Sequence, residues 1–344
     1  MSHHTTTATH AAAHDLYIDG QWVAGQGSIA NLNPSDTRDV IGQYAQASVD
    51  QVADAIQAAK RGQAQWAQSG LEQRYSVLMA IGDELIARKA ELGELLAREE
   101  GKTLAEGVGE VHRSGQFFHY YGAEVLRQID ERADSVRPGV EVEVRREPVG
   151  VVGVISPWNF PMATAVWKIA PALAFGNSVV FKPANLVPAS AWALTEIIHR
   201  QSLPAGTFNL VMGPGSSIGD ELISSPDIHA LSFTGSLEVG RRVAAATAAN
   251  LVKCQLEMGS KNALIIADDA DMELAVEAAF NGAYSGTGQK CTASSRLIVM
   301  ESVHDEFVEK LTQRLSQVRV GHALEEGVHM GPAVDAKQLE SNLS

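Results

Sequence analysis

Two cysteines occur in the 344 residues, and the segments around them differ. Cys291 lies in the polar segment GTGQKCTASS, after Gly286 and Gly288 end a predicted helix and before a predicted strand. A thiol in such a loop can be accessible and can act as a nucleophile. Cys254 lies in LVKCQLEM, a pattern typical of a buried strand, where a thiol is usually an inert apolar group. Taken alone, each cysteine is more often structural than catalytic.

Two other side chains could assist a nucleophile. Glu257 lies at the end of a predicted strand beside Gly259, where a carboxylate could activate water as a general base. Asn159 lies in PWNFP, and its amide could donate a hydrogen bond to a developing oxyanion. Considered singly, an exposed glutamate and a turn asparagine between prolines are the more ordinary interpretations.

The ends of predicted strands also carry residues suited to a nucleotide. PWN, KPAN and FTGS each follow a strand, and ligands of parallel sheets bind at the carboxyl ends of strands. Gly235 and Ser236 begin a predicted helix, whose N–H groups can meet a pyrophosphate. Gly215 permits close approach of the backbone, but Gly219 falls one place late for a G-x-G-x-x-G fingerprint.

The elements that must position these residues alternate regularly from Pro148 onward. VGVVGVISP, NSVVFKP, TFNLVMG, ALSFTG and KCQLEMG are predicted strands, separated by helical stretches such as 188–201 and 237–249. This alternation predicts a doubly wound α/β domain. A second α/β unit is expected after Gly259, with NALIIA, a helix over 272–284 and RLIVM.

The first half of the chain is predicted to be mainly helical. Residues 1–14, rich in Thr, Ala and His, predict a disordered tail, and LYIDGQWV predicts a short strand. A second extended segment over 29–45 is interrupted by a turn at Asn33–Asp36. Predicted helices then cover 49–68, with Ser48 or Asp50 as the N-cap, 71–98 and 104–129. VEVEVRRE, at 140–147, alternates valine with charge and predicts a strand on a separate small sheet or at an interface.

Composition excludes several classes of function. The formal charge of -14, from 27 basic and 41 acidic side chains, argues against a nucleic-acid or anionic-membrane surface. No apolar run approaches the ~20 residues that span a bilayer. The start lacks a secretory pattern and the cysteines do not look paired, so a reducing cytoplasm is expected. His112, His119 and His199 have unrelated spacings, and we assign no metal.

Five segments that occur in a fixed order favour catalytic and cofactor-binding roles for these candidate residues. PWNFP, FKPAN, FTGS, LEMGSKN and GQKCTA resemble, in order and spacing, the aldehyde dehydrogenase superfamily. The resemblance runs from about Leu16 to the last residue, and five ordered motifs make coincidence negligible. It implies NAD(P)-dependent oxidation of an aldehyde to a carboxylic acid. It also implies a Rossmann-like cofactor domain, a second α/β catalytic domain and a small β oligomerisation arm.

The resemblance implies a division of the chain. The cofactor domain would comprise residues 15–129 and 148–258, the arm 130–147 and an incomplete catalytic domain 259–344. Relatives are longer, continuing to a glutamate-phenylalanine-glycine-proline segment that holds the nicotinamide ribose, and the full-length protein is expected to be a homodimer or homotetramer. If the chain is complete as given, we expect poor stability and little turnover, because an apolar sheet edge would be open. The alternative is a catalytically inactive nucleotide-binding or scaffolding fragment.

The resemblance also implies roles for the chemical candidates. Cys291 would attack the aldehyde, and the Asn159 amide with the Cys291 N–H would hold the oxyanion of the thiohemiacetal. Glu257 would activate the water that hydrolyses the thioester, since relatives that transfer the acyl group to coenzyme A lack this carboxylate. Lys168 matches a family lysine near the nicotinamide ribose and the nucleophile; the plainer interpretation is a surface lysine.

The cofactor is expected to be NAD or NADP. Asn185 replaces a glutamate that many NAD-preferring relatives use against a 2′-phosphate, so we expect relaxed selectivity. Ser260 replaces a glycine of the family's Leu-Gly-Gly. Sixteen positions match cofactor-binding residues of the family: Ile155, Ser156, Pro157, Trp158, Lys182, Ala184, Asn185, Gly215, Gly219, Phe233, Thr234, Gly235, Ser236, Val239, Met258 and Gly259.

Substrate selectivity is expected from a tunnel that leads to the cysteine. The family resemblance places tunnel residues near Met162 and Trp167 and beside Gln289 and Thr292. FKPANLVPASAW and TGQKCTASSRLIV look most like the bacterial α-ketoglutarate semialdehyde (2,5-dioxovalerate) dehydrogenases. Succinate semialdehyde and other small aldehydes stay open as substrates.

Overall fold

The computed structural model describes residues 13–127 and 130–343, and at its centre lies a seven-stranded sheet of order β11-β10-β7-β8-β9-β1-β2. β7 to β11 run parallel, β1 runs antiparallel to β9, and β2 runs antiparallel to β1. The predicted α/β class is confirmed, and the sheet is mixed. Its strands are β1 (Leu16–Ile18), β2 (Gln21–Val23), β7 (Val151–Ile155), β8 (Ser178–Lys182), β9 (Phe208–Leu210), β10 (Ala230–Gly235) and β11 (Lys253–Met258).

The parallel part of the sheet is built outward from β7 in two directions. β8 and β9 follow on one side of β7, whereas β10 and β11 follow on the other. Where the strand order reverses, the connections after neighbouring strands diverge and leave a crevice at their carboxyl ends. The segments PWN, after β7, and FTGS, at the end of β10, therefore lie at this crevice.

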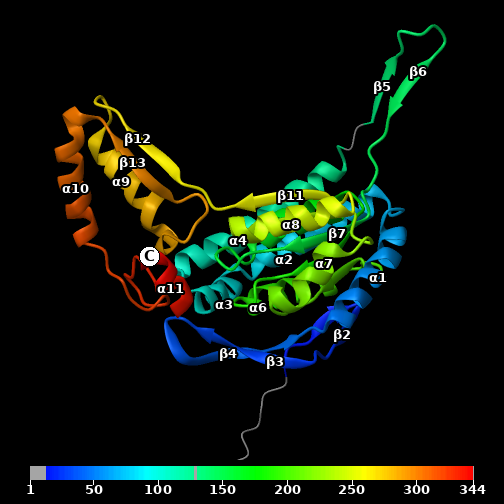
Figure 1. Cartoon of the computed structure of the whole chain (residues 1–344), viewed down its shortest axis with the longest axis horizontal. Coiled ribbons are helices and arrows are strands. Elements are labelled where there is room, and N and C mark those ends of the chain that lie inside the picture. Colours follow the sequence, from blue (N-terminus) through cyan, green and yellow to red (C-terminus); the bar gives the residue numbers. More distant parts are fainter. Residues whose placement is uncertain (1–12, 128–129, 344) are drawn as a thin grey trace, which may run out of the picture.

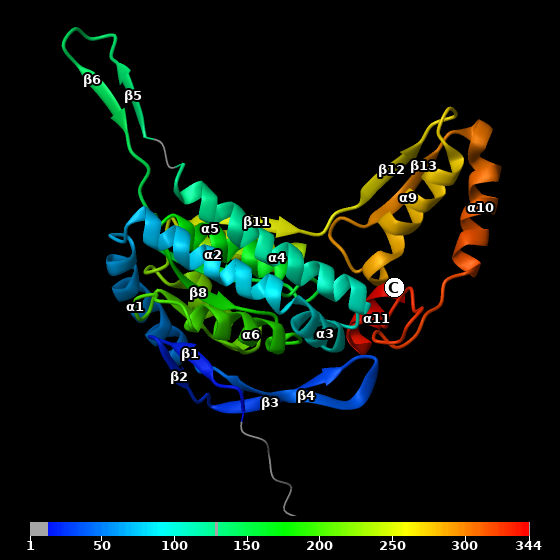
Figure 2. The same cartoon turned by 180° about the vertical axis from the view of Figure 1, so that it is seen from behind.

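Helices cover both faces of the parallel strands (Figures 1 and 2). β7 and β8 are buried along their whole length, as their apolar sequences predict for strands covered on both sides. One face packs against α1 (Val49–Trp66), α7 (Asp220–Ser224) and α8 (Leu237–Ala249), and the other against α5 (Ala163–Ala174) and α6 (Pro188–His199). Outside α5 and α6 lie α2 (Leu71–Ala87), α3 (Lys89–Glu100) and α4 (Leu104–Val125).

Several predicted boundaries are confirmed and others need correction. Ser48 is the N-cap of α1 and forms a capping box with Gln51. The strand predicted from LYIDGQWV is two strands, because Asp19 and Gly20 adopt left-handed backbone angles and form a turn. The helix predicted over 71–98 breaks at Arg88 into α2 and α3.

The two ends of the helical region also differ from the prediction. The helix predicted over 104–129 ends at Val125, and residues 128–129 lie outside the described part. The predicted tail falls mostly on residues 1–12, which also lie outside it. His14, however, forms a β-bridge with Tyr44 and stacks on its ring, so the ordered part begins before residue 15. β3 (Gly27–Asn33) and β4 (Asp36–Gln46) pair around the predicted turn.

A second α/β unit follows the sheet (Figure 2). β12 (Asn262–Ile266) and β13 (Ser294–Val299) form a parallel pair, with a small core provided by α9 (Met272–Tyr284) and α10 (His304–Ser316). The side chains of Ile265 and Ile298 are 70% and 53% exposed, so this small sheet has an uncovered apolar face. The last described helix is α11 (Ala336–Leu343).

A hairpin projects from the body of the molecule (Figure 1). It consists of β5 (Glu131–Asp134) and β6 (Glu141–Val144), which pair antiparallel with every residue exposed. The predicted strand over 140–147 is therefore shorter but present, on a separate small sheet. Within residues 13–127 and 130–343, no helix has the length and apolar character needed to cross a membrane.

Candidate active site

A cavity of about 1330 Å³ lies at the carboxyl ends of β7 and β10. Side chains from the sheet, from α4 and α5, and from the loop that carries Cys291 line it together. Among the predicted catalytic residues the cavity gathers Asn159, Lys168, Glu257 and Cys291. Among the predicted cofactor residues it gathers Ile155, Ser156, Pro157, Trp158, Lys182, Gly215, Phe233, Thr234, Gly235, Ser236, Val239, Met258 and Gly259.

A few predicted residues do not line this cavity. Ala184 and Asn185 follow β8 and are half-buried beside it, and Gly219 is buried at the end of a π-helical turn, Gly215–Gly219. Met162, expected near the substrate tunnel, is 1% exposed and belongs to the hydrophobic core. Trp167, one helical turn and a half further along α5, lines the cavity instead.

The environment of Cys254 differs from the prediction. Both cysteines are exposed, although LVKCQLEM was expected to be a buried strand. The reason is topological, because β11 is the edge strand of the sheet and only Leu256 and Met258 on it pack against the core. Cys254 therefore lies outside the cavity but is accessible to reagents.

Asn159 is held at both its backbone and its side chain. Its side-chain amide donates a 2.8 Å hydrogen bond to the carbonyl oxygen of Gln289, in the loop that leads to Cys291. Its backbone carbonyl accepts a 2.7 Å bond from the ammonium of Lys102. One amide hydrogen of Asn159 remains for another acceptor, since an NH₂ group carries two donors.

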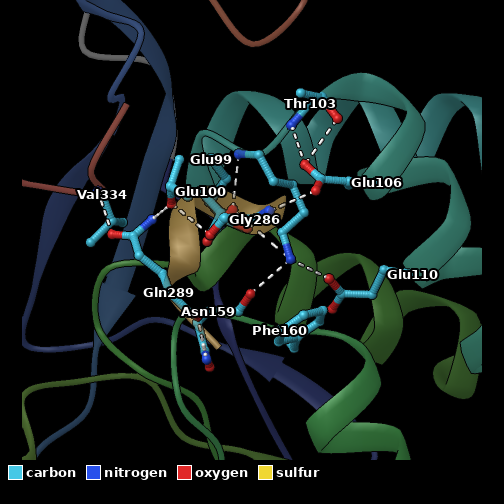
Figure 3. A network of polar contacts seen from close by, with 12 residues as sticks. Glu99, Glu100, Thr103, Glu106, Glu110, Asn159, Phe160, Gly286, Gln289 and Val334 are labelled. Atoms are coloured by element: carbon cyan, nitrogen blue, oxygen red, sulfur yellow. Dashed lines mark hydrogen bonds and ion pairs between the residues drawn. The ribbon is translucent and has the colours of Figure 1, made fainter. Parts of the chain in front are cut away.

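Lys102 is the centre of a buried polar network that sequence reasoning missed. It is 3% exposed, and its Nζ also donates to Glu110 Oε2 at 2.7 Å and lies 3.9 Å from the Phe160 ring centre. Burial disfavours the ammonium, but the attraction of Glu110 and Glu100 outweighs it and raises the pKa of Lys102. Figure 3 shows Glu110, Asn159 and Phe160 gathered around this point. A buried charge that is paired in this way fixes the groups around it.

Two glutamates of α4 extend this network to neighbouring elements. Glu110 Oε1 accepts 3.0 Å bonds from the N–H groups of Met162 and Ala163, at the start of α5. Glu106 accepts bonds from Thr103 and a 2.7 Å bond from the N–H of Gly286, before Cys291 (Figure 3). The sequence signal for Glu106 was the pattern Thr-x-x-Glu, which is typical of a capping box.

The loop before Cys291 has an unusual backbone. Gly286, Thr287 and Gly288 all have positive φ angles, of 61°, 55° and 67°. A β-branched residue such as Thr287 adopts this conformation only when its surroundings impose it. The ammonium of Lys290 donates to Ser285 Oγ and to the Asn281 carbonyl, so it is directed toward α9. The thiol therefore projects from a loop that is constrained at several points.

Glu257 and Lys168 are connected through Gln255. The Gln255 amide donates a 2.8 Å bond to Glu257 Oε1, and Lys168 Nζ lies 3.3 Å from Gln255 Oε1 and 3.0 Å from Ser232 Oγ. Burial lowers the pKa of Lys168 to about 8, and the charge of Glu257 acts in the opposite direction. Lys168 is therefore placed beside the predicted base, on the β10–β11 side of the cavity.

Several features of the cavity fit a dinucleotide. Ser236 caps α8 and accepts a hydrogen bond from the Val239 N–H at 3.3 Å. Ser236, Leu237 and Val239 line the cavity, so the start of this helix is placed where its N–H groups can bind a phosphate. Ser156 lines the cavity, and its Oγ is buried without a hydrogen-bond partner among the described residues. A side chain at Gly215 or Gly259 would meet no atom within 4 Å, which leaves room for a ligand.

Lys182 lies on the cofactor side of this cavity. It is 5% exposed and donates to the carbonyls of Pro183 and Gly213 at 2.9 Å and 3.2 Å. Burial lowers its pKa to about 8.

A metal site is not found in the described ranges, because no three His, Cys, Asp or Glu side chains there are grouped to hold an ion.

Comparisons with known proteins agree with this geometry. The chain matches the model described as "Aldehyde dehydrogenase family" over residues 22–344. It is 41% identical to the α-ketoglutaric semialdehyde dehydrogenase of Bacillus subtilis, over 95% of this chain and 68% of that protein. It is 36% identical to the NADP+ succinate-semialdehyde dehydrogenase of Escherichia coli, over 94% and 67%. The betaine aldehyde dehydrogenase of Staphylococcus aureus, solved with NAD+, matches with a TM-score of 0.93 at 35% identity, over 96% of this chain and 67% of that one.

Proposed function

We propose an activity for this chain on one premise: it belongs to the aldehyde dehydrogenase family. We infer that it oxidises an aldehyde to a carboxylic acid with NAD(P)+. One observation carries this proposal, which is the cavity that brings Cys291, Asn159 and Glu257 together from three separate segments. The chain spans about two thirds of the length of the relatives it matches, so the activity of the whole protein is part of the proposal.

The first step is addition of the Cys291 sulfur to the aldehyde carbon. The carbonyl oxygen becomes an oxyanion, and the free amide hydrogen of Asn159 together with the Cys291 N–H can donate to it. Loss of one such donor typically costs about 3 kcal/mol of transition-state stabilisation. The bonds from Lys102 and to Gln289 keep the Asn159 amide beside the thiol loop, so little reorganisation is needed when the charge develops.

The second step converts the adduct into a thioester, and the third releases the acid. NAD(P)+, when bound, supplies the acceptor for the hydride that leaves the thiohemiacetal carbon. Glu257 then takes a proton from a water molecule, which attacks the thioester carbon and releases the acid and the Cys291 thiol. Glu257 is exposed, and among the described residues its side chain accepts one hydrogen bond, from Gln255, so its carboxylate is free to turn toward water.

The cofactor is proposed to be either NAD or NADP. Relatives are described with each of them, NAD+ for the Staphylococcus aureus structure and NADP+ for the Escherichia coli enzyme. Asn185 is neutral and lies just beyond β8. We expect kcat/KM with NAD+ and with NADP+ to differ modestly; a ratio above about 1000 for either cofactor would contradict relaxed selectivity.

A semialdehyde is the proposed substrate class. The relatives that support it are the α-ketoglutaric semialdehyde and succinate-semialdehyde dehydrogenases, at 41% and 36% identity. α-Ketoglutarate semialdehyde is our first choice, because the segments around Asn185 and Cys291 resemble that group. A homodimeric or homotetrameric assembly is proposed from the same resemblance, and localisation in the cytoplasm is proposed because both cysteines are free thiols.

Cys291 and Glu257 are proposed to act in different steps, and this difference provides the test. We expect Glu257→Gln to retain a rapid formation of NAD(P)H in the first turnover but to lose steady-state turnover, because the thioester forms and is not hydrolysed. Mass spectrometry of the trapped variant would detect the added acyl group. A Glu257→Gln variant with unchanged steady-state turnover would overturn the role of Glu257, and absence of any acyl adduct would favour a nucleotide-binding protein without turnover.

A further inference from the structure

We propose that Arg113 binds the far end of the substrate, and that the substrate carries a carboxylate there. This inference rests on the proposed aldehyde oxidation and extends it to the chemical class of the substrate. Arg113 was not among the residues predicted from the sequence. It is an exposed side chain of α4 that lines the same cavity as Cys291.

The helical repeat of α4 places Arg113 on the face that lines the cavity. Gly109 and Glu110 each lie three or four residues from both Glu106 and Arg113, and all four residues line the cavity. A side chain at Gly109 would meet no atom within 4 Å. Open space therefore lies about one helical turn before Arg113, on the side toward Glu106 and the loop of Cys291.

The spacing along α4 limits the distance between Arg113 and the loop that carries Cys291. Glu106 anchors the loop before Cys291 through the Gly286 N–H, and Arg113 lies seven residues further along α4. Seven residues correspond to about 10 Å along a helix axis. Long helical side chains lean back toward the helix N-terminus, which shortens the gap. The carbon chain of a semialdehyde would span the remaining distance between the Arg113 guanidinium and the aldehyde carbon at Cys291.

The charges of the other residues on this face are already satisfied. Glu110 is paired with Lys102 and with two backbone N–H groups of α5, and Glu106 accepts from Thr103 and Gly286. Arg113, in contrast, donates to the neutral Gln116 side chain at 3.1 Å and forms no ion pair within the described ranges. Its planar guanidinium can donate two parallel bonds to a carboxylate.

The ring of Phe117 orients the Arg113 guanidinium and leaves its positive charge available. The guanidinium lies 5.0 Å from the Phe117 ring centre, and Phe117 meets Trp167, which lines the cavity, edge to face at 5.7 Å. Lys102 lies over Phe160, another ring of the cavity. A quaternary ammonium substrate, such as betaine aldehyde, needs free aromatic faces. Here Phe160 of the cavity and its neighbour Phe117 already face cations of the protein, and the charge of Arg113 repels a cationic substrate.

Two aldehydes of equal length test the proposal. Succinate semialdehyde carries the distal carboxylate and butanal lacks it. We expect Arg113→Met to lower kcat/KM for succinate semialdehyde about 10- to 100-fold, the effect of losing a charge-assisted hydrogen bond. The value for butanal should stay within about twofold. Arg127→Met is the matched control, since Arg127 is paired with Glu124 just beyond α4 and lies outside the cavity.

Equal losses of kcat/KM for both aldehydes, or no loss for either, would overturn the proposal.

A binding measurement separates the proposal for Arg113 from the proposed function. Succinate is the acid that succinate semialdehyde yields, butanamide is a neutral molecule of the same chain length, and calorimetry can measure the affinity of both in the absence of turnover. We expect Arg113→Met to weaken binding of succinate but not of butanamide. If no aldehyde is oxidised, the proposed function fails, while the same difference in binding would still support Arg113 as a carboxylate site. Equal binding of succinate by wild type and variant would contradict it.

Discussion

Two lysines at the cavity are held in surroundings that disfavour their charge. Lys168 and Lys182 are both almost fully buried, and burial lowers the pKa of each to about 8. Neither forms an ion pair within the described ranges; Lys182 donates only to two backbone carbonyls. Such groups are costly to bury and are often found at functional sites, because a ligand of opposite charge relieves the cost.

The titration of Lys182 can be measured through stability. Between pH 8 and 10.5 this lysine is charged in the unfolded chain and mostly neutral in the folded one. The unfolded state then binds more protons, so stability rises with pH across this window. We expect the free energy of unfolding of the wild type, relative to Lys182→Met, to increase by about 2 kcal/mol from pH 7.5 to 9.5 in urea titrations. A difference that does not change with pH would contradict the lowered pKa.

Single residues also show where sequence reasoning ends. Asn159, Glu257 and Cys291 were identified because their segments resemble motifs of the aldehyde dehydrogenase superfamily, whereas each residue taken alone had a plainer interpretation. Arg113 was missed because nothing in a helical sequence indicates which of its charged faces will line a cavity. Lys102 was missed because it lies between α3 and α4, where the sequence does not show that a lysine will be buried. Cys254 was placed in a buried strand, but its pattern does not reveal that β11 ends the sheet.

At the scale of elements, α4 connects the start of α5 to the thiol loop. Its glutamates accept hydrogen bonds from the N–H groups at the start of α5 and from the N–H of Gly286. Parallel strands and the reversal of strand order could be predicted from the alternation of apolar strands and helices. The packing of α4 against α5 could not, because those contacts join segments far apart in the sequence.

The capping boxes of α1 and α4 allow an effect on helix stability to be distinguished from an effect on the position of the thiol loop. Gln51 completes the box of α1, and Glu106 bonds Thr103 at the start of α4 but also holds the Gly286 N–H. We expect Gln51→Ala and Glu106→Ala each to cost about 1 kcal/mol of stability, measured by thermal unfolding. Only Glu106→Ala should lower kcat, because it also releases the loop before Cys291. Equal kcat values for the two variants would show that this bond does not position the thiol.

For the whole molecule, the projecting hairpin is a second exposed apolar feature beside the uncovered face of the β12–β13 sheet. Val142 and Val144 share one face of β6, Val140 lies just before this strand, and the three side chains are 43 to 46% exposed. A two-stranded hairpin is marginally stable in isolation, and an apolar face on it suits contact with another copy of the chain.

Sedimentation velocity tests this assembly. We expect the wild-type chain to form dimers or larger species, and a Val142→Lys, Val144→Lys double variant to shift toward monomer because charge would be buried at the contact. The variant should keep its secondary structure by circular dichroism, since the hairpin contacts little of the body. A wild type that is monomeric at high concentration would contradict the assembly.

The central claim is that Cys291 carries out aldehyde oxidation, and single-turnover absorbance of NAD(P)H tests it most directly. The chain is mixed with cofactor and α-ketoglutarate semialdehyde in a stopped-flow instrument. We predict a rapid burst of NAD(P)H, stoichiometric with the protein, that Cys291→Ala abolishes. Cys254→Ala should leave the burst intact, although both thiols are exposed. Cofactor binding without any burst, or a burst that survives in Cys291→Ala, would contradict the account.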